Sequence, residues 1–215
     1  MPQPEPRRNC PVPDPLDTSS PLLRPGTTCW RLEHADRVAF IIDAADYYGA
    51  VKAAMLKAKH SIILLGWDFD TRVGLESDPS DPKVPNRFGE FLERLVETRP
   101  KLRIHVLKWD FSMIFALERE IFPTALLDLM THTRVSFRLD GEHPAGACHH
   151  QKLVVIDDAV AFCGGIDITA NRWDTSEHLD HDIRRRRPNG ELYDPFHDMM
   201  MAVDGNAAAA LGELA

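Results

Sequence analysis

An imidazole and a primary amine are spaced so that one rigid segment can present both to the same reactant. His150 and Lys152 lie two residues apart, directly before the apolar run 153–156, and in an extended chain side chains two apart point to the same side. An imidazole can attack phosphorus, and an ammonium group can hold the non-bridging oxygens of a phosphoester as their charge rearranges. Asp157 follows the run, and its carboxylate can orient a neighbouring group by hydrogen bonding. These residue types predict chemistry on a phosphoester.

The surrounding stretch, 149–167, predicts a hairpin of two short strands at 153–156 and 160–163. Gly164 and Gly165 close the hairpin with a backbone free of Cβ atoms. A purely structural reading, in which the histidine and the lysine are satisfied core residues, competes with the chemical one. Two unpaired cations in a core strand would be costly, so we favour the chemical reading.

The elements around this hairpin alternate between strand and helix, which is the pattern of an α/β sheet covered by helices. Residues 71–85 are rich in Asp, Pro and Ser and predict a loop. The predicted elements are a hairpin on both sides of residues 34–36 whose second strand ends at Asp43, a helix from the N-cap Asp43 to about Lys59, a strand from 61, a helix over 87–98 capped by Asn86, strands at 103–109 and 134–140 with a helix over 112–131 between them, and a later strand within 195–203.

Functional residues of α/β sheets gather at the carboxyl ends of strands and in the loops that follow. By this rule we expect several polar and aromatic residues to surround the central hairpin. They are Trp67, Asp68, Asp70, Trp109, Asp110 and the loop 140–149.

His150, Lys152 and Asp157 spell H-x-K-x-x-x-x-D, which resembles the signature of the phospholipase D superfamily. The segment 164–167, Gly-Gly-Ile-Asp, resembles the glycine-containing tail of that motif and is similar to first-motif copies in two-motif phospholipases and phosphatidyltransferases. The resemblance implies a phospholipase D-like mixed β-sheet flanked by helices, forming one motif-bearing half.

The resemblance also implies roles for individual residues. His150 looks like the nucleophile that forms a phosphohistidine, Lys152 like the phosphate ligand, and Asp157 like a structural hydrogen-bonding partner. No metal and no cofactor is implied. The residues expected to bind substrate are Asp167, Gly164, Gly165, His149, Trp67 and Asp68.

In that superfamily two motifs meet to form one site, but Lys152 is the last lysine of this chain, so no second H-x-K follows it. A homodimer can supply the second motif, as in single-motif relatives, or the second motif can lie in a C-terminal half beyond residue 215. Because the helix-forming terminal residues stop without a stop signal, we favour the second option. The expected domains are a disordered, proline-rich leader at 1–27 and the first half of a catalytic domain at 28–215.

Three functions fit these observations: cleavage or exchange of phospholipid head groups, a nuclease-like phosphodiesterase, and a non-catalytic half that binds phosphate or a partner. The formal net charge of −8 argues against holding nucleic acid by bulk phosphate neutralisation. The basic run 184–187 is interpreted as a hydrated loop. The chain holds no apolar run of membrane-spanning length. The wide spacing of its cysteines favours reduced thiols, so we expect a cytoplasmic protein, with peripheral membrane contact as a further option.

Two other groups of residues are given structural readings. The cluster His178, Asp180, His181 and Asp182 could bind a metal, but its spacing does not match a helical ligand pair, and we favour a solvated loop. The cysteines are widely spaced and are interpreted as reduced thiols. They are Cys10, Cys29, Cys148 and Cys163.

Overall fold

The structure, a computed structural model, describes residues 22–79, 81–109, 132–142, 144 and 147–215. The chain divides into two units, 1–34 and 35–215. In the described part of the first unit, the Thr28 hydroxyl donates to the carbonyl of Leu22 at 2.7 Å and closes a turn. Most of the predicted leader, 1–27, lies outside the described residues, so its disorder stays a prediction.

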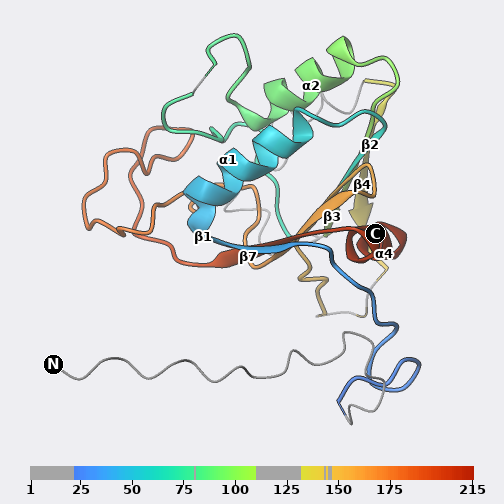
Figure 1. Cartoon of the computed structure of the whole chain (residues 1–215). Helices are drawn as coiled ribbons and strands as arrows, with labels where there is room; N and C mark the ends of the chain where they lie inside the picture. The colour runs from blue at the N-terminus through green and yellow to red at the C-terminus, as the bar shows by residue number, and fades with distance from the viewer. Residues whose placement is uncertain (1–21, 80, 110–131, 143, 145–146) are drawn as a thin grey trace, which may run out of the picture. The chain divides into compact units, whose positions relative to one another are not determined.

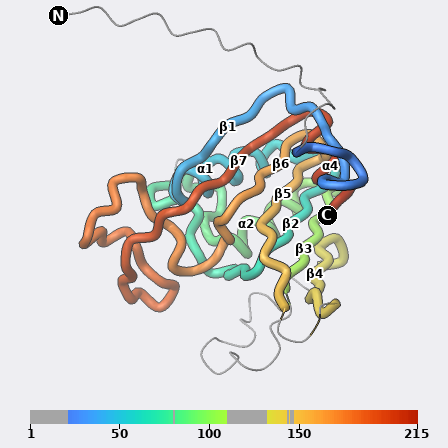
Figure 2. Tube along the Cα trace, turned by 90° about the horizontal axis from the view of Figure 1, so that it is seen from below, coloured from blue at the N-terminus to red at the C-terminus, as the bar shows by residue number. Residues whose placement is uncertain are grey.

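The second unit is built on a seven-stranded sheet, and the predicted α/β class with a mixed sheet is confirmed. The strand order is β1-β7-β6-β5-β2-β3-β4 (Figure 2). Strands β2, β3 and β4 run parallel to one another, and every other pairing is antiparallel. The strands are β1 Val38–Ile42, β2 Ser61–Gly66, β3 Arg103–Trp109, β4 Val135–Asp140, β5 Leu153–Ile156, β6 Val160–Gly164 and β7 Met199–Asp204.

Helices cover both faces of this sheet. Helices α1, Asp43–Met55, and α2, Phe88–Thr98, lie together on one face (Figure 1), where Tyr47, Tyr48 and Phe91 are buried. Helix α4, Asn206–Leu214, packs Ala208 and Leu211 against a smaller apolar cluster on strands β5, β6 and β7. Among the described residues, no helix is both long and apolar enough to cross a bilayer. The predicted helix at 112–131 lies outside the described residues.

The predicted N-terminal hairpin is wrong in its pairing. Residues 30–35 form no strand, and β1 instead pairs with β7 in a register that joins Val38 to Val203. In this pairing Ile41 is partly buried and packs against the core, while the other four residues of β1 stay exposed. A pairing between segments so far apart leaves no local turn signal that the sequence could show.

Two helix boundaries also differ from the prediction. Helix α1 ends at Met55 rather than near Lys59, because Asp157 binds the backbone N–H groups of residues 59–61 and starts β2 there. Asn86 does not cap α2. Its side chain instead accepts from the N–H of Glu76 at 3.0 Å and donates to the carbonyl of the same residue at 2.7 Å, closing the loop before the helix.

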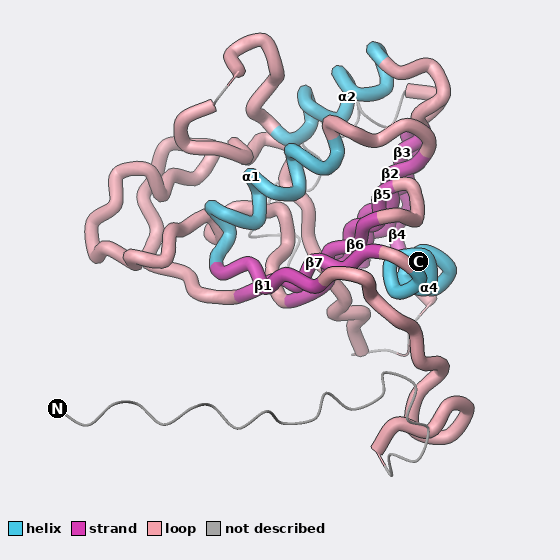
Figure 3. Tube along the Cα trace, viewed as in Figure 1, coloured by secondary structure: helices cyan, strands magenta, loops and turns pink. Residues whose placement is uncertain are grey.

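The topology directs several loops to one end of the sheet. Strands β2, β3 and β4 end there, and the antiparallel pairings make β5 and β7 begin there and β6 and β1 end there. The long connection from β6 to β7, residues 165–198, returns from this end and has neither helix nor strand (Figure 3). This end carries the candidate site.

Candidate functional site

His150 stands at the surface on an aromatic support. The residue is exposed, directly before β5, and its ring meets Trp67 edge-on with the ring centroids 5.8 Å apart. Trp67 follows β2 and stacks on Trp109 at 5.7 Å, so two strand ends fix the support. No described residue forms a hydrogen bond with the His150 ring. The imidazole is therefore positioned by packing and open to an incoming phosphorus atom.

Lys152 lies behind His150 in a buried ion pair. Its Nζ is 3.1 Å from Asp167 Oδ2, and the two side chains are 4% and 1% exposed. The same ammonium lies 6.0 Å from the Trp67 ring centroid, so the two cationic groups of the motif share one aromatic neighbour. An ammonium has three N–H donors, and pairing with one carboxylate leaves capacity for a phosphate oxygen.

Asp167 is fixed from several sides. Its Oδ1 accepts the N–H of Trp67 at 2.9 Å, and its carbonyl accepts the hydroxyl of Tyr48 at 2.8 Å. Burial raises the pKa of this carboxyl above its usual value, and the Lys152 ammonium and the hydrogen bonds offset only part of that rise. Asp167 therefore serves as the counter-charge and orienting partner of Lys152.

Asp157 occupies the opposite end of β5. Its Oδ1 accepts the N–H groups of His60 at 2.7 Å and Ser61 at 2.8 Å, and Oδ2 accepts that of Lys59 at 2.7 Å. Burial would raise the pKa of Asp157, but the three backbone donors outweigh it and lower that pKa. The whole of β5, about 13 Å of strand, and the two residues before it lie between Asp157 and His150. Its carboxylate therefore joins β5 to the start of β2 and has no contact with the site.

The other predicted binding residues lie at the same end of the sheet but are already engaged. Asp68 accepts the Thr169 hydroxyl at 2.8 Å and pairs with Lys108 at 2.7 Å. His149 pairs through Nδ1 with Asp140, and both line a cavity of about 20 Å³ beside Trp109. Asp110 lies outside the described residues.

Gly164 and Gly165 are packing positions in this structure. A Cβ on Gly165 would lie 2.2 Å from Asp198 Oδ1, and one on Gly164 would lie 2.4 Å from the carbonyl oxygen of Met199. The two glycines therefore let the end of β6 approach the segment that enters β7. This close approach places Asp167 beneath Lys152.

The loop 165–198 contains a buried ion pair that the sequence did not reveal. Arg185 is 1% exposed and lies 3.1 Å from Asp174, which is fully buried. Burial would raise the pKa of Asp174, but hydrogen bonds from His178, Phe196 N–H, Arg185 and Thr175 N–H outweigh it and lower that pKa. The interpretation of the basic run 184–187 as a hydrated loop is therefore wrong for Arg185. A run of four arginines gives no local sign that one of them is buried.

A larger cavity, about 240 Å³, lies within the same unit and borders Thr169 and Trp173. Its lining includes Glu76, Arg184 and Arg186 but neither His150 nor Lys152. His150 stands at an open surface with the buried Lys152 behind it, and neither cavity is lined by these two residues.

Comparison with known proteins shows the family to which the chain belongs. The family model described as "Phospholipase D" matches residues 54–213. Phospholipase D B of Dictyostelium discoideum is 27% identical over 158 residues, which cover 73% of this chain and 13% of the relative. Phospholipase D zeta 1 of Arabidopsis thaliana is 27% identical over 149 residues, covering 68% of this chain and 13% of the relative. The chain thus spans a small fraction of the length of these relatives.

Among solved structures, the phospholipase D family member Nuc from Salmonella typhimurium superposes with a TM-score of 0.48 at 14% identity, covering 83% of this chain and 90% of that one. NucT from Helicobacter pylori has the same TM-score at 9% identity, covering 83% and 92%. The family model covers most of the chain, including the hairpin with His150 and Lys152. The chain belongs to the phospholipase D family.

Proposed function

We propose that this chain is one motif-bearing half of a phosphodiesterase that hydrolyses or exchanges phospholipid head groups, with His150 as the nucleophile. The observation that carries the proposal is the exposed His150 ring on Trp67 with the buried Lys152–Asp167 pair behind it. Attack on a phosphodiester needs two groups: a nucleophile that the substrate can reach and a fixed cation beside it.

The proposed reaction has two steps. A ring nitrogen of His150 forms a bond to phosphorus while the bond to the leaving alcohol breaks, and the alcohol takes a proton from a general acid. Water or an acceptor alcohol then attacks the phosphohistidine, loses its proton to the same group, and frees His150. Lys152 neutralises the non-bridging oxygens in both steps.

The general acid is expected from a second motif-bearing half, because the sequence holds one H-x-K and no further lysine after it. An exposed apolar strip on β1 and β7 is a suitable docking surface for that half. Val38, Phe40 and Ile42 on β1 and Met199 on β7 are 52%, 69%, 37% and 43% exposed. Ile42 and Met199 are register partners at the end of the sheet that carries His150. A half docked on this strip would lie at the same end of the sheet as the nucleophile, up to three strand positions, or about 14 Å, away.

The phospholipid substrate is favoured over nucleic acid for two reasons. The relatives that match in sequence are named phospholipases D, and the formal net charge of −8 disfavours a polyanion. A nuclease-like activity and a non-catalytic, phosphate-binding half are the alternatives.

The role of His150 can be tested without the second half. A diester with a p-nitrophenolate leaving group needs no general acid, so the purified chain should cleave it and form an acid-labile phosphoryl adduct on His150. His150→Asn should abolish both, and Lys152→Met should slow cleavage by about 10²-fold to 10³-fold. His60→Asn, at the opposite end of the sheet, is the matched control and should behave like the wild type.

Substrate class is tested in parallel with phosphatidylcholine vesicles and single-stranded DNA. Release of choline without DNA cleavage supports the lipid assignment, and the reverse result supports the nuclease. Wild-type turnover in His150→Asn, or an adduct on another residue, would contradict the proposed mechanism.

A further inference from the structure

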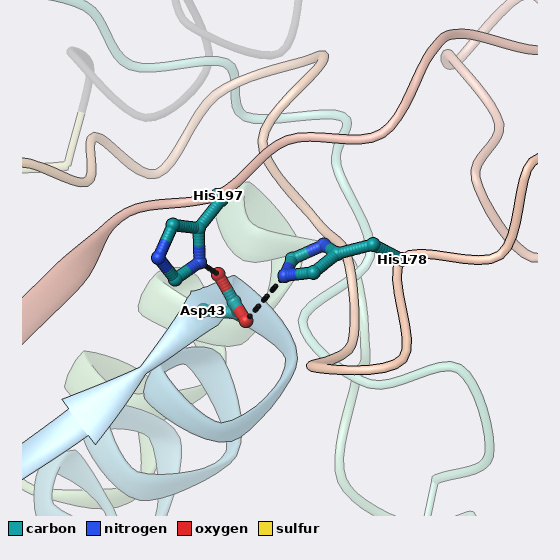
Figure 4. Close-up of side chains that lie close together, drawn as sticks. All are labelled: Asp43, His178 and His197. Atoms are coloured by element: carbon teal, nitrogen blue, oxygen red, sulfur yellow. Dashed lines mark hydrogen bonds and ion pairs between the residues drawn. The ribbon is translucent and has the colours of Figure 1, made fainter.

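Three side chains from distant parts of the sequence converge at the edge of the sheet (Figure 4). Asp43 is the first residue of α1, directly after β1, and the two histidines lie in the loop 165–198, His197 two residues before β7. His197 Nδ1 is 2.8 Å from Asp43 Oδ1, and His178 Nε2 is 3.2 Å from Asp43 Oδ2. One ligand atom from each residue falls within 4.8 Å of the other two.

We propose that Asp43, His178 and His197 bind one divalent transition-metal ion of the Zn²⁺ type. Two imidazole nitrogens and one carboxylate oxygen form a donor set that such ions prefer, with a fourth position left for water. The sequence alone suggested a different group, His178 with Asp180, His181 and Asp182. Only His178 belongs to both, because the fold brings the other two ligands from segments more than a hundred residues apart.

The carboxylate of Asp43 supplies the first argument. Asp43 is fully buried, and its Oδ1 accepts the N–H of Asp198 at 3.2 Å as well as facing His197. Its Oδ2 is buried, and no described residue forms a hydrogen bond with it; what it faces is His178 Nε2. A buried carboxylate oxygen without a hydrogen bond is costly. A cation bound between Asp43 and the two imidazoles would satisfy it.

The second argument comes from the other side of the His178 ring. His178 Nδ1 lies 3.1 Å from Asp174 Oδ2, and the Arg185 guanidinium and the N–H groups of Thr175 and Phe196 hold that carboxylate in place. A carboxylate held by donors accepts from Nδ1, which leaves Nε2 directed at Asp43. Metal-binding histidines commonly carry this carboxylate partner on the second nitrogen, where it fixes the ring and its tautomer.

The cluster is open to solvent on one side. The side chains of His197 and His178 are 66% and 30% exposed, and their rings meet edge to face at 5.1 Å. Ligand atoms around a tetrahedral Zn²⁺ lie about 3.3 Å apart, as Zn–N and Zn–O distances near 2.0 Å require. The observed separations from Asp43 need only small outward shifts of the exposed imidazoles.

The proposed ion has a structural role. His150 precedes β5 and Asp43 follows β1, three strand positions along the sheet, so the two sites are about 14 Å apart. The ion would join the start of α1 to two parts of the loop 165–198, the second of them directly before β7. Asp198, next to His197, fills the space beside Gly165 and accepts the Asp43 N–H through its carbonyl at 2.8 Å. The ion would therefore hold in place the segment that carries Asp167.

The test measures binding and needs no turnover. The full chain is stripped with a chelator, dialysed and titrated calorimetrically with Zn²⁺. We expect one ion per chain and, at free Zn²⁺ about a hundredfold above its Kd, a rise in Tm of about 5 to 11 °C. His197→Ala and Asp43→Asn should each raise the Kd at least about tenfold. Asparagine tolerates the φ of +65° at position 43, so this variant keeps the local backbone.

His181→Ala is the matched control, because it removes an exposed histidine from the same loop outside the cluster. It should bind Zn²⁺ like the wild type. Co²⁺ provides a second readout: visible d–d absorption in the wild type and in His181→Ala, and its loss in His197→Ala. Failure of the wild-type chain to bind one Zn²⁺, or equal weakening in His181→Ala and His197→Ala, would overturn the proposal.

Discussion

At the residue scale, the buried Lys152–Asp167 pair makes single and double replacements behave differently. Lys152→Met leaves the Asp167 carboxylate buried without its counter-charge, so the free energy of unfolding should fall by about 3–5 kcal/mol. Adding Asp167→Asn removes the stranded charge and should recover part of that loss. Urea denaturation of the two single variants and the double variant measures this coupling.

Lys108→Met is the control for the loss of a lysine at this end of the sheet. Lys108 pairs with Asp68, but its side chain is 28% exposed, so its replacement should cost no more than about 1 kcal/mol. Equal losses in Lys108→Met and Lys152→Met would contradict the importance of burial.

Asp157 gives a prediction with a defined pH dependence. Its pKa is lowered in the folded state, so its stabilising contribution is complete above the unfolded value of 3.8 and disappears as the pH falls through the folded value. Asp157→Asn should lower the free energy of unfolding at pH 7 by about 1–3 kcal/mol, because charged acceptors form the stronger hydrogen bonds. The difference from the wild type should shrink below pH 3.8.

Denaturant titrations at pH 7 and at about pH 3 test this expectation. Asp158→Asn is the matched control, since Asp158 has the same φ of 52° but is exposed. If the difference in unfolding free energy between Asp157→Asn and the wild type does not change with pH, the hydrogen bonds from the backbone N–H groups do not depend on the negative charge of Asp157.

At the element scale, the approach of β6 to the start of β7 depends on Gly165. A methyl group there would lie 2.2 Å from Asp198 Oδ1, so Gly165→Ala should lower the free energy of unfolding by about 1–3 kcal/mol and displace Asp167. Asp198→Ala in the same chain should relieve the clash. Thermal unfolding measures the loss of stability, and cleavage of the p-nitrophenyl diester reports the displacement of Asp167.

Gly49→Ala serves as the opposite control. Gly49 lies within α1, and nothing lies within 4 Å of a Cβ placed on it. Alanine there should raise the free energy of unfolding by about 0.5–1 kcal/mol through helix propensity. A destabilised Gly49→Ala would mean that alanine is poorly tolerated for reasons other than close contact.

The elements show which parts of the fold the sequence could predict. Buried strands such as β2 and β5 are continuous apolar runs, and α2 has a clear apolar face, so local patterns suffice for them. The prediction of an N-terminal hairpin was wrong because the partner of β1 is β7, which lies at the other end of the chain. Within the site, the sequence indicated His150, Lys152 and Asp167 as a group but could not show that the last two form a buried pair.

Long-range pairing also explains what was missed. Asp43 meets His178 and His197, more than a hundred residues later, only when the loop 165–198 packs against the start of α1. Asp174 and Arg185 lie eleven residues apart in that loop and pair through its irregular path. A spacing rule detects ligands on one helix or strand. It cannot detect side chains that meet because distant or irregular segments fold together.

At the scale of the whole molecule, completion of the site depends on the apolar strip formed by Val38, Phe40, Ile42 and Met199. For the purified chain the second half can only be a second copy. Its activity on an unactivated diester should therefore rise more steeply than linearly with protein concentration. Phe40→Glu should remove this steep dependence, because it places a charge on the strip without disturbing the core.

Ile183→Glu is matched in exposure, since Ile183 and Phe40 are both 69% exposed. Ile183 lies in the loop 165–198 rather than on the strip, and its variant should keep the wild-type dependence. Sedimentation velocity checks the association directly. Indistinguishable behaviour of the two glutamate variants would place the docking surface elsewhere.

The pairing of β1 with β7 has a consequence for synthesis on the ribosome. Val38 emerges from the ribosome long before its register partner Val203 exists. At about 5–20 residues per second, β1 waits roughly 8 to 33 seconds with its ladder N–H and C=O groups unpaired. During that interval the apolar residues of β1 are exposed and can associate with other chains. Nascent chains arrested before residue 199 should therefore bind ribosome-associated chaperones. Release from the chaperone should coincide with the emergence of β7.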